Sequence, residues 1–154
     1  MRGSPRVVVT FGFCRAGPSG PPRGLMKVLV IDDDDIAREA LCSTLNAAGH
    51  ETFELQSSIG ATRCIYEQKV DAVVIDVMMP TINGDKLARV FRNNAHGEHL
   101  AIVLVSSRSA SELRPLTDLA QADAVVSKAD VSRSLVQAVE RAVERRLGTG
   151  RSAK

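Results

Sequence analysis

The chain has 154 residues, which suits one domain with short tails rather than two domains. It is 44% hydrophobic, 25% charged and only 3% aromatic, so the core must be aliphatic, and a nucleic-acid platform of stacked rings is disfavoured. Three cysteines without a CxxC pair exclude a disulfide framework or zinc knuckle and indicate a reducing, cytoplasmic location. No run of about 18 apolar residues suggests a membrane span.

The net charge of +2 is unevenly distributed along the chain. Residues 1–24 contain four arginines and no acidic residue, which leaves 16 of the 20 basic residues against all 18 acidic ones, a net charge of −2 for the rest. A mildly acidic body binds nucleic acid poorly, because phosphate contacts depend on Lys and Arg. We therefore expect neither nucleic acid nor membrane among the partners.

The first 25 residues differ in composition from the remainder. Residues 1–24 hold four of the six prolines and five of the eleven glycines, and this segment is predicted to be disordered. A second interpretation is that Met26 is the true start, which leaves open whether residues 1–25 are translated. A secretory signal is disfavoured, because Gly12 interrupts the apolar run and Arg15 ends it. We thus expect a head at 1–25, a domain at 26–147 and a flexible tail at 148–154.

The domain alternates apolar, β-branched runs with segments of helical spacing. Continuous apolar runs indicate strands covered on both faces, whereas 52–55 alternates polar and apolar residues and is predicted as an edge strand. The expected strands are 28–31, 52–55, 72–75, 100–105 and 124–126. The expected helices alternate with them: 36–48, ended by Gly49; Ser57 or Ser58 to about 68; around 87–91; 111–121; and through 135–147, with Asp130 as N-cap. The helix at 111–121 is the weakest of these, because Pro115 fits only in a first turn.

Five strands alternating with five helices predict an open, doubly wound α/β domain. The expected architecture is a five-stranded parallel sheet in the flavodoxin-like order 2-1-3-4-5, with helices on both faces. In such folds, ligands bind beyond the carboxyl ends of the strands. The residues that follow each strand are therefore the first place to look for chemistry.

Acidic residues follow two of these strands. Asp32 to Asp35 come directly after strand 28–31, and Asp76 ends strand 72–75. These strands are neighbours in the predicted order, so Asp32, Asp33 and Asp76 should meet. Three adjacent carboxylates repel one another unless a cation lies among them, and an all-oxygen site suits Mg²⁺. Asp34 and Asp35 are sufficiently explained as capping residues of the following helix.

Two further strands add a hydroxyl and a cation. Ser106 and Ser107 follow strand 100–105, and Lys128 follows strand 124–126. Of the two serines we favour Ser106 as the site hydroxyl, because it comes directly after the strand. A metal, a nucleophilic carboxylate, a lysine and a hydroxyl can together accept a phosphoryl group, giving an aspartyl phosphate. The pattern therefore predicts phosphoryl transfer to a carboxylate.

The sequence resembles the receiver domain of bacterial response regulators over about residues 26–147. The matching segments are Val28-Leu29-Val30-Ile31-Asp32-Asp33-Asp34, Val74-Ile75-Asp76-Val77-Met78-Met79-Pro80 with Asn83-Gly84, Val103-Leu104-Val105-Ser106-Ser107, and Ala122-Asp123 leading to Lys128. Each is weak alone, but four in the right order are a strong signal. Because no output domain follows, the chain looks like a stand-alone receiver of the chemotaxis-regulator kind.

The resemblance implies a role for each site residue. Asp76 would be the phosphoacceptor. Asp33, Asp76 and the backbone carbonyl of Met78 would hold Mg²⁺, and Asp32 would act mainly through a metal-bound water. Lys128 would pair with the phosphoryl oxygens, and Ser106 would hydrogen-bond the phosphoryl group. Pro80 and Gly84 would shape the loop after Asp76.

Three positions depart from the family pattern. Val125 stands where an aromatic residue is usual, and valine cannot turn inward as that ring does. Ala129 replaces the usual proline after the lysine, and Ser106 replaces the commoner threonine, which keeps the hydroxyl. We therefore expect intact phosphorylation chemistry, with a switch that reports it in an altered way.

The function expected from the resemblance is that of a cytoplasmic single-domain response regulator. It would accept a phosphoryl group on Asp76 from a histidine kinase or a phosphotransfer protein, with Mg²⁺ as cofactor. Partner binding would then change at the face formed by helix 111–121, strand 124–126 and the last helix. It would be no enzyme beyond catalysing its own phosphoryl transfer and dephosphorylation.

Two alternatives belong to other classes. One is a phosphorylation-independent, receiver-like interaction module, suggested by Val125, Ala129 and Pro115. The other is a Mg²⁺-dependent phosphatase with an aspartyl nucleophile in the pattern Asp32-x-Asp34. Ile36 stands where the phosphatase would need a hydroxyl residue, so this alternative is the weakest.

Overall fold

The computed structural model describes residues 6–8, 24–80, 82–94, 97–109, 111–112, 114–115, 118 and 121–151, with only the backbone at 6–8 and 148–151. Within these ranges, none of the helices combines the length and the apolar character needed to cross a membrane.

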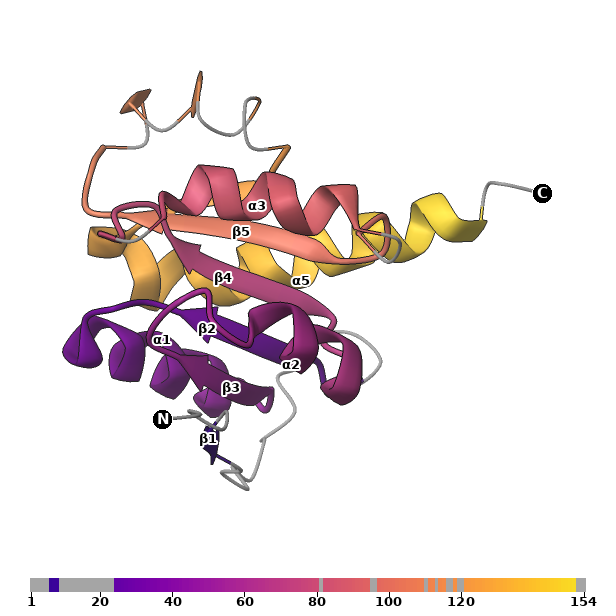
Figure 1. Ribbon diagram of the computed structural model, residues 1–154. Helices are drawn as coiled ribbons and strands as arrows, with labels where there is room; N and C mark the ends of the chain where they lie inside the picture. The colour runs from indigo at the N-terminus through magenta and orange to yellow at the C-terminus, as the bar shows by residue number, and fades with distance from the viewer. Residues whose placement is uncertain are drawn as a thin grey trace.

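A single sheet forms the centre of the molecule (Figure 1). Its strands are β1 (Arg6–Val8), β2 (Lys27–Ile31), β3 (Glu51–Leu55), β4 (Ala72–Asp76), β5 (Ala101–Ser106) and β6 (Ala124–Ser127). They lie in the order β1-β3-β2-β4-β5-β6, and every neighbouring pair from β3 to β6 is parallel. This confirms the predicted parallel order 2-1-3-4-5, with β2 as the first of the five strands.

The strand β1 corrects the prediction that the whole head is unstructured. It pairs antiparallel with β3, with Val7 opposite Phe53 and Val8 opposite Thr52, so β3 is not the edge strand expected from its alternating pattern. The physical reason is that an open strand edge offers unpaired N–H and C=O groups to any nearby segment of high β propensity. The rest of the predicted head up to Arg23 lies outside the described residues.

Helices cover both faces of the sheet (Figure 1). Helices α1 (Asp35–Ala47) and α5 (Val131–Arg151) pack on one face, and α2 (Ala61–Gln68) and α3 (Gly84–Asn93) pack on the other. The two cores are aliphatic, as predicted, with Phe53 and Phe91 as buried aromatic exceptions on the α2–α3 side. All side chains of β4 and β5 are buried, which is why their sequences are continuously apolar up to their ends.

The helix ends follow the predictions in part. Asp34 caps α1 by accepting from the N–H groups of Ile36 and Ala37, and Gly49 follows the helix with a φ of 93°, which favours glycine. The expected start of α2 at Ser57 or Ser58 is wrong: Gly60, at a φ of 83°, is the N-cap and the helix begins at Ala61. The two serines lie in the preceding turn, where Ser57 Oγ accepts from Ile59 N–H instead.

Of the last two predicted helices, 135–147 can be compared with the structure in full and 111–121 only in part. Helix α5 begins at Val131, directly after a 3₁₀ turn at Lys128–Asp130 that contains the expected N-cap, Asp130. Ser127 accepts a hydrogen bond from Ala129 N–H at the start of that turn. Five of the eleven residues of the predicted helix 111–121, at 113, 116, 117, 119 and 120, lie outside the described residues.

Candidate functional site

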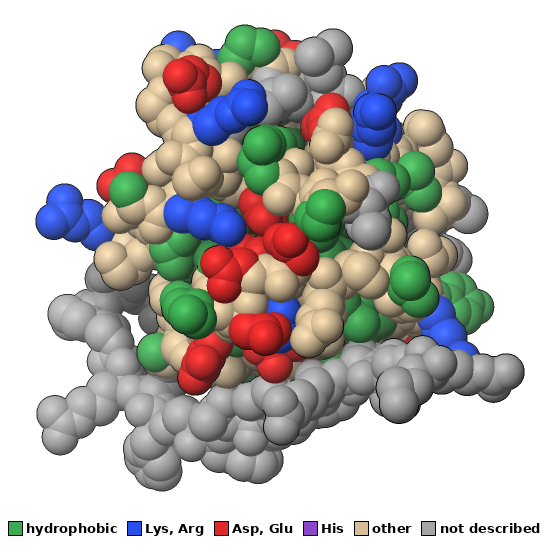
Figure 2. Space-filling model, turned by 60° about the vertical axis from the view of Figure 1, so that its left-hand side comes forward, with side chains coloured by type: hydrophobic (Ala, Val, Ile, Leu, Met, Phe, Trp, Pro, Cys, Tyr) green, Lys and Arg blue, Asp and Glu red, His purple; other side chains and the backbone are tan. Residues whose placement is uncertain are grey.

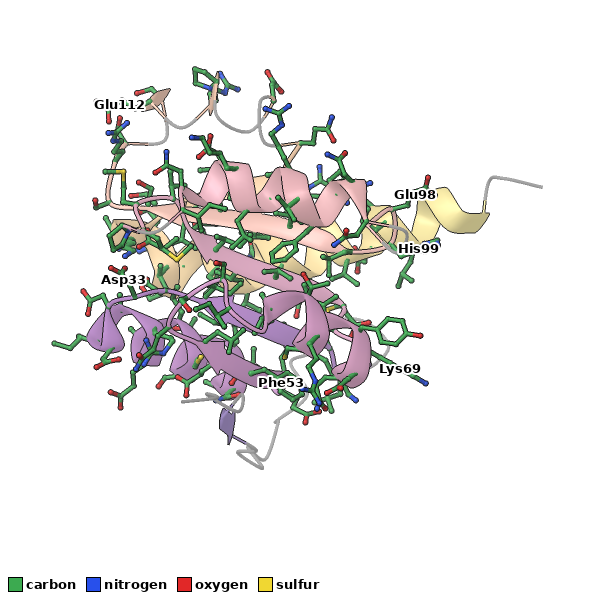
Figure 3. The ribbon with its side chains drawn as sticks, in the orientation of Figure 1. Asp33, Phe53, Lys69, Glu98, His99 and Glu112 are labelled. Carbon is green, nitrogen blue, oxygen red and sulfur yellow. The ribbon has the colours of Figure 1, made fainter. Side chains whose placement is uncertain are left out.

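The predicted acidic residues meet at the carboxyl edge of the sheet. Residues 28–31 of β2 pair in register with 72–75 of β4, so Asp32 and Asp76 are the next residues along two adjacent strands. Carboxylate oxygens of Asp32, Asp33 and Asp76 all lie within 4.8 Å of one another. Asp33 lies at the edge towards which the arrows of β2 and β4 point (Figures 1 and 3). The convergence expected from the strand order is therefore present.

Two of the three carboxylates are buried, whereas Asp33 faces solvent. Each buried carboxylate is oriented by a backbone N–H from the loop that follows its strand. Asp34 N–H donates to Asp32 Oδ1 over 2.9 Å, and Met78 N–H donates to Asp76 Oδ1 over 3.2 Å. The loops thus fix one oxygen of each carboxylate and leave the other free for a further partner.

Lys128 is the cation that faces these remaining oxygens. Its Nζ lies 3.1 Å from Asp32 Oδ2 and 3.6 Å from Asp76 Oδ2. Burial alone would lower the pKa of Lys128, but the carboxylates of Asp32 and Asp76 outweigh it, and the net pKa is raised. The lysine therefore stays charged at neutral pH.

The pocket still carries more negative than positive charge. Burial raises the pKa of Asp76, and the nearby charge of Asp32 raises it further, against the opposing effects of Met78 N–H and Lys128. A raised carboxyl pKa means that the ionised form lacks full compensation for the water it has lost. A divalent cation beside Asp76 would supply that compensation.

The donor set fits Mg²⁺. Asp32 Oδ2 is fully buried and accepts no hydrogen bond from the described part of the chain, with Lys128 as its ion-pair partner. This buried oxygen, paired with Lys128, lies beside two further carboxylates, which is the all-oxygen environment that Mg²⁺ prefers. Asp33 and Asp76 offer direct ligands, and Met78 lies in the loop expected to supply a carbonyl.

Ser106 is placed on the strand next to Asp76. Asp76 pairs with Val105 across β4 and β5, so Ser106 is the following residue at the same carboxyl edge. The serine is buried, and its Oγ accepts from Arg108 N–H over 3.2 Å. The neighbouring departure from the family pattern, Val125 on β6, is half-buried and packs against the core on the α2–α3 side.

Gly84 explains why the loop after Asp76 needs a glycine. A Cβ at this position would lie 2.3 Å from the backbone oxygen of Asp76 and 2.9 Å from Val77 Cα. The N–H of Gly84 also donates to Val77 O over 3.0 Å. The first turn of α3 therefore rests directly on the backbone of the predicted phosphoacceptor.

One residue near the site was not predicted from the sequence. Arg38 of α1 donates from Nη1 to the backbone oxygen of Asp32 over 2.8 Å and pairs with the carboxylate of Asp35. Its spacing of three residues from Asp35 on a helix could have indicated the ion pair, but the contact with Asp32 depends on the loop conformation.

The surface around the pocket combines acidic and apolar side chains. In the view that brings the carboxyl edge of the sheet forward, acidic side chains gather in the middle of the face and hydrophobic ones border them (Figure 2). Ile36, Ile59 and Met78, all in segments at this edge, are 81%, 82% and 54% exposed. A protein that reaches the pocket would contact this apolar border.

Comparison with known proteins agrees with the fold and the order of the motifs. Residues 28–140 match the family model of the response regulator receiver domain. The chain is 34% identical over 85 residues to the response regulator MprA of Mycobacterium sp. (strain KMS), covering 55% of this chain and 36% of that protein. It is 28% identical over 125 residues to the phosphate regulon transcriptional regulatory protein PhoB of Pseudomonas aeruginosa, covering 81% of this chain and 54% of that protein.

Solved structures show the same fold. The chemotaxis protein CheY4 of Vibrio cholerae superposes with a TM-score of 0.70 at 21% identity, covering 77% of this chain and 99% of that one. A CheY-like receiver domain protein of Methanospirillum hungatei also gives 0.70, at 18% identity, covering 82% and 99%. The chain spans about a third to a half of the length of these two curated relatives. With the family model covering most of its length, this chain belongs to the response regulator receiver domains of two-component phosphorelay signalling.

Proposed function

We propose that this receiver accepts a phosphoryl group on Asp76 from a histidine kinase or a phosphotransfer protein, in a reaction that requires Mg²⁺. The observation that carries the proposal is the position of Lys128, whose Nζ lies within 3.6 Å of both Asp32 and Asp76. A lysine that pairs with two buried carboxylates can also pair with the oxygens of a phosphoryl group, where it stabilises the negative charge that develops during transfer.

The residues support a simple sequence of events. An oxygen of Asp76 attacks phosphorus, and the bond from phosphorus to the donor breaks. Lys128 then exchanges its contact with the carboxylate for one with a phosphoryl oxygen, and Ser106 turns its hydroxyl from Arg108 N–H towards the group. Bound Mg²⁺, held by Asp33, Asp76 and the carbonyl of Met78, would neutralise charge on the phosphoryl oxygens, with Asp32 orienting its water.

Intact-mass measurement tests the proposal directly. After incubation with acetyl phosphate and Mg²⁺, we expect one phosphoryl adduct that survives acid, is lost in base and maps to Asp76. Asp76→Asn should give no adduct. Beryllofluoride with Mg²⁺ should bind the wild type and not Asp76→Ala, and equal binding to both would remove the proposal.

The readout would be a change in protein–protein binding. We propose that phosphorylation shifts the population of two packings at the face formed by residues 111–121, β6 and α5, and that partners bind there. The net charge of −2 outside residues 1–24 supports a protein partner over nucleic acid, and a cytoplasmic location fits the cysteine content. Two further points stay predictions. One is that the receiver acts without an attached output domain, and the other is that it has no enzymatic activity beyond its own phosphoryl transfer and dephosphorylation.

A second candidate function is a phosphorylation-independent interaction module. The packing of Val125 against the core favours it, because no aromatic ring is available at that position to turn inward. Amide spectra with and without beryllofluoride distinguish the two. Shifts confined to the acidic pocket would favour the module, whereas shifts that extend to α5 would favour the switch.

The structure disfavours the phosphatase alternative. Asp34, which would be its general acid, caps α1 by accepting from Ile36 N–H over 2.9 Å and from Ala37 N–H. A carboxylate engaged in this way is turned from the pocket towards the helix. Turnover of a generic phosphate ester that survives Asp76→Asn would revive this alternative.

A further inference from the structure

We propose that Arg38 is a positioning residue for the metal pocket: it fixes the peptide that carries Asp33, and so holds the three carboxylates together. The inference rests on the proposed Mg²⁺ site. The Arg38 side chain is only 11% exposed, although α1 lies on the surface of the molecule. Its guanidinium donates hydrogen bonds to two acceptors and lies 4.0 Å from a third, on three different segments.

These acceptors surround the turn between β2 and α1. Nη1 donates to the Asp32 backbone oxygen over 2.8 Å, Nη2 pairs with the Asp35 carboxylate, and Nε lies 4.0 Å from Glu54 Oε1 on β3. A planar guanidinium with five donors can serve acceptors in several directions at once, which a lysine ammonium on a flexible stem does less well.

The contact with Asp32 completes the fixation of this residue. Its N–H donates to Leu55 O over 3.2 Å, and its Oδ1 accepts from Asp34 N–H over 2.9 Å. The bond from Arg38 to the carbonyl oxygen holds the second backbone polar group of Asp32. Since this carbonyl belongs to the peptide that joins Asp32 to Asp33, its orientation sets the direction in which the Asp33 side chain leaves the loop.

The contrast with a plain surface ion pair is visible in the same chain. Arg63 and Glu67 form an i, i+4 pair on α2 over 2.8 Å, but the Arg63 side chain is 79% exposed. Arg63 is therefore a matched control, an arginine paired on a helix without a role in a loop.

The sign of the effect on Mg²⁺ affinity separates positioning from simple electrostatics. Arg38 is a positive charge close to a cation site, so its field alone opposes Mg²⁺ binding, and its removal would then strengthen binding. If Arg38 holds the ligands in place, its removal weakens binding instead, and loss of such a supporting group typically costs 10–100-fold in metal affinity.

The experiment is calorimetric titration of Mg²⁺ into the full chain and its variants. We expect the Kd of Arg38→Gln to rise by about 10-fold, that of Arg38→Lys to rise by a smaller factor, and that of Arg63→Gln to stay within about twofold of wild type. An Arg38→Gln Kd equal to or below that of wild type would overturn the proposal. If Arg38→Gln does not fold, Arg38→Lys decides, and a Kd within twofold of wild type overturns the proposal.

A metal-free measurement keeps this inference apart from the proposed function. In EDTA, amide hydrogen exchange at Asp33 and Asp34 should be faster in Arg38→Gln than in wild type and unchanged in Arg63→Gln. If wild type and Asp33→Asn respond alike to Mg²⁺, the proposed metal site is wrong. Suppose instead that wild type and Asp33→Asn differ in their response to Mg²⁺, but that Arg38→Gln has the amide exchange rates and the Mg²⁺ Kd of wild type. Then only the positioning role of Arg38 is wrong.

Discussion

Asp32, Asp76 and Lys128 bring two buried carboxylates and one positive charge together, and a further cation would balance the remaining negative charge. We expect Mg²⁺ at ten times its Kd to raise the free energy of unfolding by about 1.4 kcal/mol, which corresponds to a rise in melting temperature of roughly 5 °C. Asp33→Asn should lose most of this rise, whereas Glu39→Gln, an exposed acid on α1, should keep it. Thermal melts in EDTA and in Mg²⁺ measure the difference, and an equal rise in both variants would contradict the assignment of Asp33.

Cys42 carries a pH prediction at the same scale. Burial raises its pKa to about 12, with the charge of Glu54 adding to the effect. The folded protein therefore holds a thiol where the unfolded chain, with a pKa near 9.0, begins to ionise. The pKa of this thiol is higher in the folded than in the unfolded protein. The free energy of unfolding therefore decreases as the pH rises above the thiol pKa of the unfolded chain, and a lower pH has no such effect.

We expect alkylation by iodoacetamide at pH 8 to leave Cys42 unmodified in the native protein and to modify it after unfolding. Peptide mapping by mass spectrometry locates the modified cysteine. Modification of native Cys42 at the rate of a free thiol would show that the α1–β3 contact opens readily.

At the scale of elements, a partly buried charge cluster joins the amino ends of β5 and β6 to two helices. Arg92 of α3 and Arg146 of α5 both pair with Asp123, at 3.0 and 2.6 Å, and Asp123 also accepts from Ile102 N–H of β5. Arg92 donates further to the carbonyls of Gly97 and Leu100, so this one side chain connects the end of α3 to the start of β5. Its exposed fraction is only 9%, so the charge depends on its partners.

Asp123→Asn should therefore destabilise the fold strongly. Removing one partner of a buried ion pair leaves the other charge uncompensated, and the cost of about 3–5 kcal/mol is an upper bound for this partly buried cluster. Glu67→Gln, which breaks the exposed pair with Arg63, should cost no more than about 1 kcal/mol. Urea denaturation of both variants gives the comparison, and a loss below 1 kcal/mol for Asp123→Asn would contradict the role of the cluster.

The helix starts show where local sequence rules were insufficient. Asp34 caps α1 as predicted, because the cap and its helix are adjacent in sequence. Helix α2 begins at Ala61 rather than near Ser57, because the chain makes a further turn through Gly60 before it meets the sheet. Both serines are suitable caps, so composition could not decide between a helix and a turn.

At the scale of the whole molecule, the acidic pocket opens within an apolar border that a phosphodonor protein would contact. Ile36 is 81% exposed at the start of α1, next to the acidic loop. We expect Ile36→Glu to slow phosphoryl transfer from a cognate histidine kinase at least 10-fold, since it places a charge in a desolvated contact. Phosphorylation by acetyl phosphate should stay within about twofold of wild type, because a small donor needs no docking surface.

Rates measured with both donors test this prediction. Val90→Glu, another exposed apolar position on α3, serves as the control and should transfer normally from the kinase. Equal slowing with the kinase and with acetyl phosphate would indicate a damaged pocket instead of a lost contact.

The sequence by itself determined the five parallel strands, their order, and the convergence of Asp32, Asp33, Asp76 and Lys128. These features follow from patterns that are local: continuous β-branched runs, and polar residues placed directly after them. Strand order then brings the ends of distant runs together without any detail of side-chain packing.

Only the tertiary structure decided the contacts between segments that are distant in sequence and the partners of individual charged side chains. These are the pairing of β1 with β3, the bond from Arg38 to the Asp32 carbonyl, and the shared Asp123 between two arginines. Each joins groups whose separation is set by loop conformation and helix orientation, and a charged residue in a sequence does not reveal which of many possible partners it will meet. From the sequence alone, Arg38 could have been a solvated surface residue; in the structure its side chain is largely buried and holds the loop after β2.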